Sequence, residues 1–117
     1  MPATDRALDL AFTAARAASD RKAQEIIALD VSDRLVLTDV FLIASGTNER
    51  QVGAIVDAVE EAMIKAGAKA VRREGVREGH WALLDYGDVV VHVFLQETRE
   101  FYDLERLWSD VGRLDWE

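Results

Sequence analysis

Three polar side chains lie where they could take part in catalysis. Ser45-Gly46 follows a long apolar run, and Asp85 and Asp88 flank a short turn later in the chain. A Ser-Gly turn that holds a triphosphate, combined with paired carboxylates that hold two divalent metals, is typical of nucleotidyl transfer. Those carboxylates usually lie two residues apart on the next strand, and the segment after Gly46 contains no such pair. We therefore expect no nucleotidyl-transfer catalysis.

A metal site can also be drawn from Asp85, Asp88 and His92. If the hairpin loop is Tyr86-Gly87, however, His92 lies about 13 Å from Asp88 at roughly 3.3 Å per residue, which is too far for one ion. Ser45 lacks the Gly-x-Ser-x-Gly context of a serine nucleophile, and no Walker or dinucleotide-binding motif is present. We predict no catalytic residue, no metal ligand and no cofactor, so the sequence argues against an enzyme.

Composition sets the class of protein. The chain has 117 residues, half of them apolar, which is enough for one domain spanning 1–117 with its own core. It has no cysteine, which excludes disulfides and fits a reducing, cytoplasmic environment. No apolar run approaches the roughly 20 residues of a membrane span, and no signal peptide is visible.

The net charge bears on the kind of partner. The 22 acidic and 14 basic side chains give a net charge of −8. Phosphate contacts supply most nucleic-acid affinity, so direct binding to RNA or DNA is disfavoured and a basic protein is the more natural partner. On charge alone, the simpler explanation is that the negative charge only keeps the protein soluble.

Periodicity predicts the elements that must position these residues. Three segments have apolar residues at helical spacing, namely 4–20, 48–66 and 98–111. Five segments are typical of strands, namely 25–31, 40–44, 68–74, 80–84 and 89–95. Thr4, Asn48 (paired with Gln51) and Thr98 are candidate N-caps, and Gly67 is expected to end the second helix. The order predicts an α/β fold with a mixed five-stranded sheet and helices on at least one face.

The hairpin has one aliphatic face and one mixed face. A loop at Tyr86-Gly87 would set Asp85 opposite Asp88 and Trp81 opposite His92. Two carboxylates directly across from each other ordinarily cost stability, unless a cation from another molecule lies between them. The alternative is that both carboxylates simply lie at a solvated hairpin end.

The C-terminal segment combines an apolar stripe with acidic residues. Five residues at helical spacing are expected to form one buried stripe, namely Phe101, Leu104, Leu107, Trp108 and Val111. Tyr102 and Glu105 would then point elsewhere. Residues 97–117 contain seven acids and three arginines. This segment, beside the hairpin, therefore carries −4, half of the net charge of −8.

Several segments together resemble the ribosomal silencing factor (RsfS or Iojap-like) family. The residues responsible are Thr38-Asp39 with Phe41, Ile43-Ala44-Ser45-Gly46-Thr47 with Arg50-Gln51, Trp81 with 83–94, and the segment 97–108 with its Phe101-Tyr102 and Leu107-Trp108 pairs. The similarity covers roughly residues 5–110, and its last block of some thirty residues is the most specific.

The resemblance implies a fold similar to that of nucleotidyltransferases without their catalytic carboxylates. It also implies binding to the large ribosomal subunit through the universal ribosomal protein numbered fourteen (the L-fourteen family), at the surface that meets the small subunit. Occupying that surface would block subunit joining and repress translation when nutrients are short. The resemblance further implies that free protein often forms homodimers.

Combined with the resemblance, the hairpin suggests a partner-binding site. In this hypothesis Trp81 packs on an apolar patch of the ribosomal protein while Asp85 and Asp88 face its basic side chains. The full predicted set is Trp81, Asp85, Tyr86, Asp88, His92, Glu97 and Tyr102. Three alternatives stay open: Trp81 as a core residue, a nucleotidyltransferase-like nucleotide-binding protein, and a structural dimer with a self-complementary face. The sequence assigns no role to Ser45-Gly46-Thr47, Arg50 and Gln51 beyond shaping a helix start.

Overall fold

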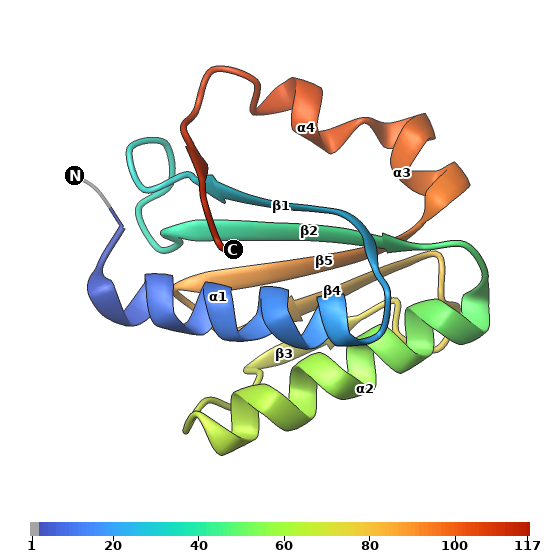
Figure 1. Ribbon diagram of the computed structural model, residues 1–117. Helices are drawn as coiled ribbons and strands as arrows, with labels where there is room; N and C mark the ends of the chain where they lie inside the picture. The colour runs from blue at the N-terminus through green and yellow to red at the C-terminus, as the bar shows by residue number, and fades with distance from the viewer. Residues whose placement is uncertain (1–2) are drawn as a thin grey trace.

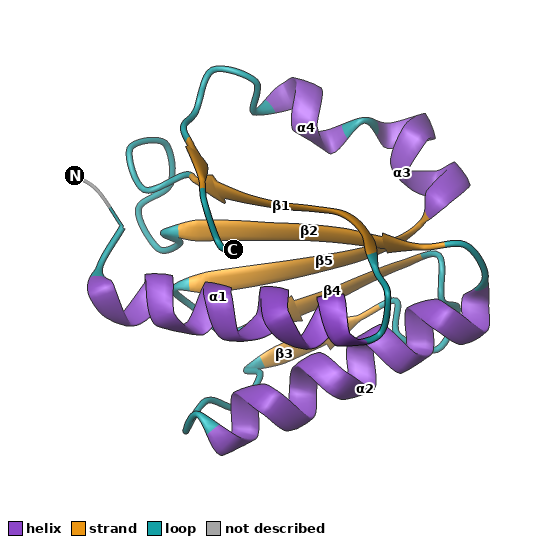
Figure 2. Ribbon diagram, viewed as in Figure 1, coloured by secondary structure: helices purple, strands orange, loops and turns teal. Residues whose placement is uncertain are grey.

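The chain forms an open mixed sheet with helices on both faces in the computed structural model, which describes residues 3–117 (Figures 1 and 2). In chain order the elements are α1 (Asp5–Asp20), β1 (Gln24–Asp30), β2 (Val40–Gly46), α2 (Glu49–Lys65), β3 (Arg72–Glu74), β4 (Trp81–Asp85), β5 (Val89–Leu95), α3 (Gln96–Tyr102), α4 (Leu104–Leu107) and β6 (Arg113–Leu114). The strand order is β3-β4-β5-β2-β1-β6. The α/β class is as predicted.

The centre of the sheet is a parallel pair of strands that is buried on both faces. β2 and β5 pair in parallel over their full length, from Val40 opposite Val89 to Gly46 opposite Leu95. Such strands are expected to be continuously apolar, because helices must cover both sides of them. Six residues of β5, Val89 through Phe94, are indeed buried.

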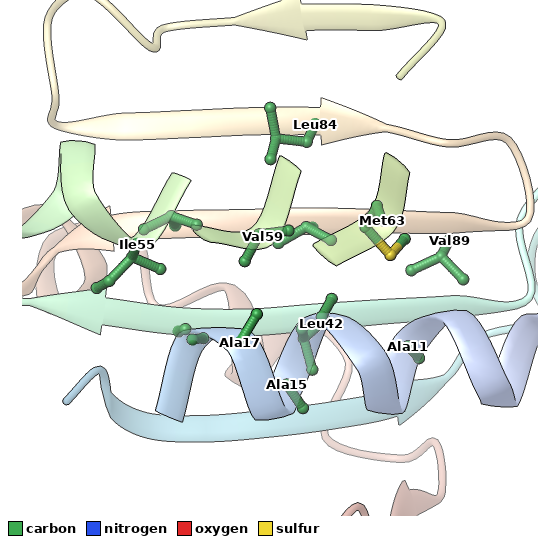
Figure 3. Close-up of a cluster of buried hydrophobic side chains, with 14 of the residues drawn as sticks. Ala11, Ala15, Ala17, Leu42, Ile55, Val59, Met63, Leu84 and Val89 are labelled. Carbon is green, nitrogen blue, oxygen red and sulfur yellow. The ribbon is translucent and has the colours of Figure 1, made fainter. Parts of the chain in front are cut away.

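The two long helices cover one face of this sheet. α1 and α2 lie side by side on the same side, with α3 and α4 on the other (Figure 1). Small side chains on α1, such as Ala11 and Ala15, let it approach the sheet closely. Larger ones on α2, such as Ile55 and Met63, fill the space above Leu84 and its neighbours (Figure 3). This larger cluster is the main core.

A smaller apolar cluster lies on the opposite face. Leu29, Val31, Ile43 and Phe94 are buried there, and Trp81 and Trp108 are among the partly buried residues packed against them. Only short helical segments, α3 and α4, cover this face. Some of its apolar surface therefore stays near solvent.

Both predicted caps of the long helices are confirmed. The Thr4 side chain accepts a hydrogen bond from the Ala7 amide at the start of α1. Asn48 Oδ1 accepts one from the Gln51 amide at 2.8 Å at the start of α2. Gly67 follows the end of α2 with φ +86°, a conformation that glycine adopts without strain.

The predicted hairpin register is wrong by two residues. Trp81 lies opposite Phe94, and Asp85 lies opposite Val90 rather than Asp88. The reason is a tight γ-like turn in which the Asp88 amide donates to the Tyr86 carbonyl and Gly87 has φ +84°. A shift of two residues keeps every side chain on its predicted face, so the aliphatic and mixed faces are unchanged.

The predicted C-terminal helix is also wrong in its continuity. α3 begins at Gln96 rather than at Thr98, and the chain breaks at Asp103, which has φ +48° and ψ 54°. The break turns α4 in a new direction, so Phe101 and Leu107 are 80% and 73% exposed instead of buried. The chain then returns to the sheet as β6, which pairs with β1 and makes six strands instead of five.

The loop before β4 gives a stability prediction. Gly75 has φ +70°, and a Cβ added there would overlap the carbonyl oxygen of Trp81. We expect Gly75→Ala to lower the free energy of unfolding in urea by at least about 2 kcal/mol. Gly87→Ala, at positive φ but in open space, should cost about 1 kcal/mol. Gly53→Ala, inside α2 with open space around it, should stabilise by about 0.5–1 kcal/mol. Equal losses for the first two variants would contradict the close approach.

Candidate functional site

A groove lies between β4 and the α3–α4 segment on the less covered face of the sheet. Its volume is about 720 Å³. Its lining residues are Trp81, Glu100, Phe101, Tyr102, Asp103, Leu104, Arg106 and Leu107. We call this surface the aromatic groove. It is open, and its lining combines apolar and aromatic side chains with charged ones.

Trp81 forms the floor of the aromatic groove and is held on three sides. Its ring stacks on Phe94 at 4.8 Å between centroids and lies 5.0 Å from Tyr102. Its indole Nε1 donates a hydrogen bond to His92 Nδ1 at 3.1 Å. Because the ring is partly buried and fully oriented, Trp81 combines core packing with an accessible face.

The structure places His92 beneath Trp81, inside the protein. It is 4% exposed, and burial lowers the pKa of its imidazole to about 4. The neutral ring accepts from the indole at Nδ1, so its proton lies on Nε2, which has no hydrogen-bond partner among the described residues. The ring also meets Phe41 edge-on at 4.8 Å. His92 therefore supports Trp81 rather than forming part of the surface.

Exposed apolar residues line the outer wall of the aromatic groove. Phe101 is 80% exposed, Leu107 73% and Tyr102 56%, and the Phe101 and Tyr102 rings contact each other at 5.0 Å. Sequence reasoning placed Phe101 and Leu107 in a buried stripe and so missed them. The only sequence signal was their position among several acids, since periodicity assumes an unbroken helix.

The predicted site residues lie near Trp81, at the end of the hairpin, or on the opposite face of the sheet. Trp81, Glu97 and Tyr102 lie together, because Glu97 and Tyr102 flank Trp81 from α3 in an adjoining pocket of about 340 Å³. Asp85 is four residues further along β4, roughly 13 Å from Trp81 at about 3.3 Å per residue. Asp88 follows in the turn, where its side chain is exposed.

Two of these residues are engaged within the chain. Asp85 accepts a hydrogen bond from the Gly87 amide at 2.8 Å and lies 3.6 Å from Arg72. Tyr86 is on the opposite face of the sheet, beside Glu60 of α2 and Arg73 of β3. Burial, together with the charge of Glu60, raises the pKa of the Tyr86 phenol to about 12. The structure does not bring Tyr86 or Asp85 to the aromatic groove.

The Ser45-Gly46-Thr47 turn is occupied by the chain's own side chains. Ser45 is fully buried, and its hydroxyl donates to Gln96 Oε1 at 2.7 Å. Gln51 Oε1 accepts from both the amide and the hydroxyl of Thr47, while its Nε2 donates to the carbonyls of Arg21 and Lys22. Gln51 therefore ties the α1–β1 turn to the start of α2. These contacts make the turn a structural junction.

Within the described residues, 3–117, no group of three or more His, Asp and Glu side chains is arranged to hold a metal ion. No helix in that part of the chain is both long and apolar enough to span a membrane. The chemistry available at the aromatic groove is apolar contact and charge pairing.

Comparisons with known proteins identify related sequences and a related structure. A family described as "Ribosomal silencing factor during starvation" matches residues 4–117. The ribosomal silencing factor of Bacillus subtilis is 40% identical over 102 residues, which cover 87% of this chain and 86% of that protein. A chloroplastic protein Iojap of Arabidopsis thaliana is 35% identical over 95% of this chain and 47% of its own. A crystal structure from Chromobacterium violaceum superposes with a TM-score of 0.84 at 40% identity, covering 86% of this chain and 84% of that one.

The burial of His92 gives a pH prediction. In the unfolded chain its pKa is near the ordinary 6.5, whereas in the folded protein it is about 4. The unfolded state therefore binds the proton first, and folding stability falls as pH drops from about 6.5 toward 4. We expect this residue alone to cost roughly 2 kcal/mol between pH 7.5 and pH 5.

The measurement is urea unfolding of wild type and His92→Gln at both pH values. The wild type should lose roughly 2 kcal/mol more than the variant on acidification. His80→Gln serves as the control, because His80 is exposed and lies 2.8 Å from Glu49. Parallel losses in wild type and His92→Gln would contradict the assignment of a neutral, buried His92.

Proposed function

This chain belongs to the ribosomal silencing factor family, and we propose that it binds the large ribosomal subunit and keeps the small subunit from joining it. Membership implies a ribosome-associated role in the regulation of translation. The finer steps are our proposal: the partner is the universal ribosomal protein numbered fourteen, the contact is the aromatic groove, and the block is steric, without bond-making. Action in the cytoplasm during nutrient limitation is part of the same proposal.

The observation that carries this proposal is the exposure of Phe101, Tyr102 and Leu107 around an oriented Trp81. A contiguous apolar patch with a charged border is a common mark of a protein interface. Aromatic side chains near the centre of such patches often contribute most of the binding energy, about 2 kcal/mol or more each when truncated. Trp81 and Phe101 are the two that we assign to this role.

Charge supports the choice of partner. Glu97, Glu100 and Asp103 are exposed at the aromatic groove and its adjoining pocket, where they outnumber the lining cation Arg106, on a chain of net charge −8. Ribosomal proteins are strongly basic because they bind RNA, so an acidic border is complementary to them. The same charge repels RNA itself. We therefore assign the contact to a ribosomal protein and not to ribosomal RNA.

Off the ribosome, the same groove can serve a second copy of the chain. An exposed aromatic patch is self-complementary in its apolar part, whereas its acidic border repels a like-charged copy. We propose that a homodimer forms through this patch when the ribosomal protein is absent. Dimerisation and ribosome binding would then compete.

Truncating Phe101 tests the contact without disturbing the core. Because the side chain is 80% exposed, Phe101→Ala should change the free energy of unfolding by less than about 0.5 kcal/mol. We expect it to weaken binding to the isolated ribosomal protein roughly 30-fold, as measured by calorimetry. Leu37→Ala is the matched control, because Leu37 is 83% exposed at a loop outside the groove. Equal affinities for the two variants would remove the groove from the interface.

A subunit-joining assay tests the mechanism. Excess wild-type protein added to purified subunits should keep large subunits free in a sucrose gradient and travel with them. Phe101→Ala should require roughly 30-fold more protein for the same effect, because the block depends on occupancy. Raising the salt concentration should weaken the effect, since charge contributes to binding. Normal joining at saturating wild-type protein would end the proposed function.

A further inference from the structure

Arg99 is a buried cation on α3 that the aromatic groove does not expose. It is 2% exposed. Its Nε lies 3.3 Å from both carboxylate oxygens of Glu105, which belongs to α4. Its Nη1 donates to Ser45 Oγ at 3.1 Å and to the Gln24 carbonyl at 3.3 Å. One guanidinium thus joins α3 to α4, β2 and β1.

The joint between α3 and α4 needs such a contact. Asp103 has φ +48°, and for a residue other than glycine this conformation is unfavourable. α4 has four residues, which is too few for a helix to be stable by itself, and neither helix has a side-chain N-cap. Tertiary contacts must therefore hold the direction of α4.

Apolar packing supplies part of that hold. Leu104 and Trp108 pack on the smaller core cluster, with Trp108 meeting the Phe41 ring at 5.2 Å. Apolar contacts of this kind are not directional, so they fix the height of α4 above the sheet better than its rotation. The contact of Arg99 Nε with both oxygens of the Glu105 carboxylate is a charge-assisted hydrogen bond, which is directional, and it spans the break.

The orientation of α4 sets the shape of the aromatic groove. Tyr102 lies on the α3 side of the break, Leu107 lies on α4, and both line the groove with Trp81. Building on the proposed function, we propose that Arg99 is a positioning residue that fixes α4 relative to α3 and so keeps the aromatic groove in its binding shape before the ribosomal protein arrives. It acts through Glu105 and does not touch the partner.

Because Arg99 is buried, its ion pair is expected to fix a geometry more than to add stability. Nη2 of Arg99 has no hydrogen-bond partner among the described residues, so the guanidinium is not fully satisfied. Buried ion pairs of this kind contribute little net stability compared with apolar replacements, and some serve to specify one geometry. Replacing both partners, in the double variant of Arg99→Met with Glu105→Gln, should therefore leave the protein folded and change the mobility of α4, whereas Arg99→Met alone leaves the Glu105 carboxylate without its cation.

The experiment compares Arg99→Met, Glu105→Gln and the double variant with wild type. Arg16→Met is the matched control, because Arg16 is exposed on α1, on the other side of the sheet. Amide hydrogen exchange in the free protein should be at least 10-fold faster at residues 103–108 in Arg99→Met. Its affinity for the isolated ribosomal protein should fall at least 10-fold, and so should that of the double variant, whose urea midpoint stays near that of the control. The double variant should bind no more weakly than Arg99→Met, because both residues act through one contact.

Exchange and affinity equal to those of Arg16→Met would overturn the proposal. Should Arg99→Met fail to fold, Arg99→Lys takes its place. Lysine keeps the positive charge but loses the Nε hydrogen bonds to the Glu105 carboxylate. Faster exchange at 103–108 is again the supporting result. If wild-type protein does not bind the ribosomal protein at all, the proposed function fails. The exchange measurement on free protein then supports or overturns the role of Arg99 by itself.

Discussion

The central parallel pair β2–β5 must be covered on both faces, and the rest of the molecule follows from that requirement. Neither strand has a polar face to turn toward water, since β2 is almost entirely buried and six of the seven residues of β5 are buried. The long helices α1 and α2 satisfy one face completely. The other face has only the short, broken α3–α4 segment, and its apolar surface extends to the protein exterior around Trp81.

Incomplete cover on the second face leaves the aromatic groove exposed and also creates a difficulty. Side chains at the edge of a small core must be oriented without the dense packing that fixes the residues of a large one. The chain uses buried polar groups for this purpose. His92 orients the indole of Trp81, and Arg99 connects α3 to α4 and to the end of β2. Both are nearly inaccessible, so their effect on a partner is indirect.

The aromatic groove thus differs from the site expected at the hairpin. The expected pair of opposed carboxylates does not form, and Asp85 is engaged by Gly87 and Arg72 at the far end of β4. The acids that surround Trp81 come from α3 and the break after it, namely Glu97, Glu100 and Asp103. Three of the predicted residues, Trp81, Glu97 and Tyr102, do lie together in the structure, and their role in binding a partner stays a prediction.

Signals that act over a few residues could be predicted from sequence. Thr4 and Asn48 cap helices through their own side chains, and Gly67 ends one because it tolerates positive φ. The alternation along β4 and β5 gave the two faces of the hairpin, and these survived a register shift because the shift was two residues. The family resemblance rests on such local blocks as well.

What only the tertiary structure decided depends on contacts between distant segments. Asp103 adopts positive φ at the break between α3 and α4. Arg99 contacts Glu105, six residues away in the chain, and Ser45, fifty-four residues away. This break exposes Phe101 and Leu107, which periodicity alone assigns to the core. β6 forms because the edge of β1 is available to it. The sequence by itself determined the two long helices, the five main strands, the class of fold and the family. The break between α3 and α4, the strand β6 and the shape of the aromatic groove were decided by long-range packing, because the energy that holds a short strained segment comes from its partners and not from its own residues.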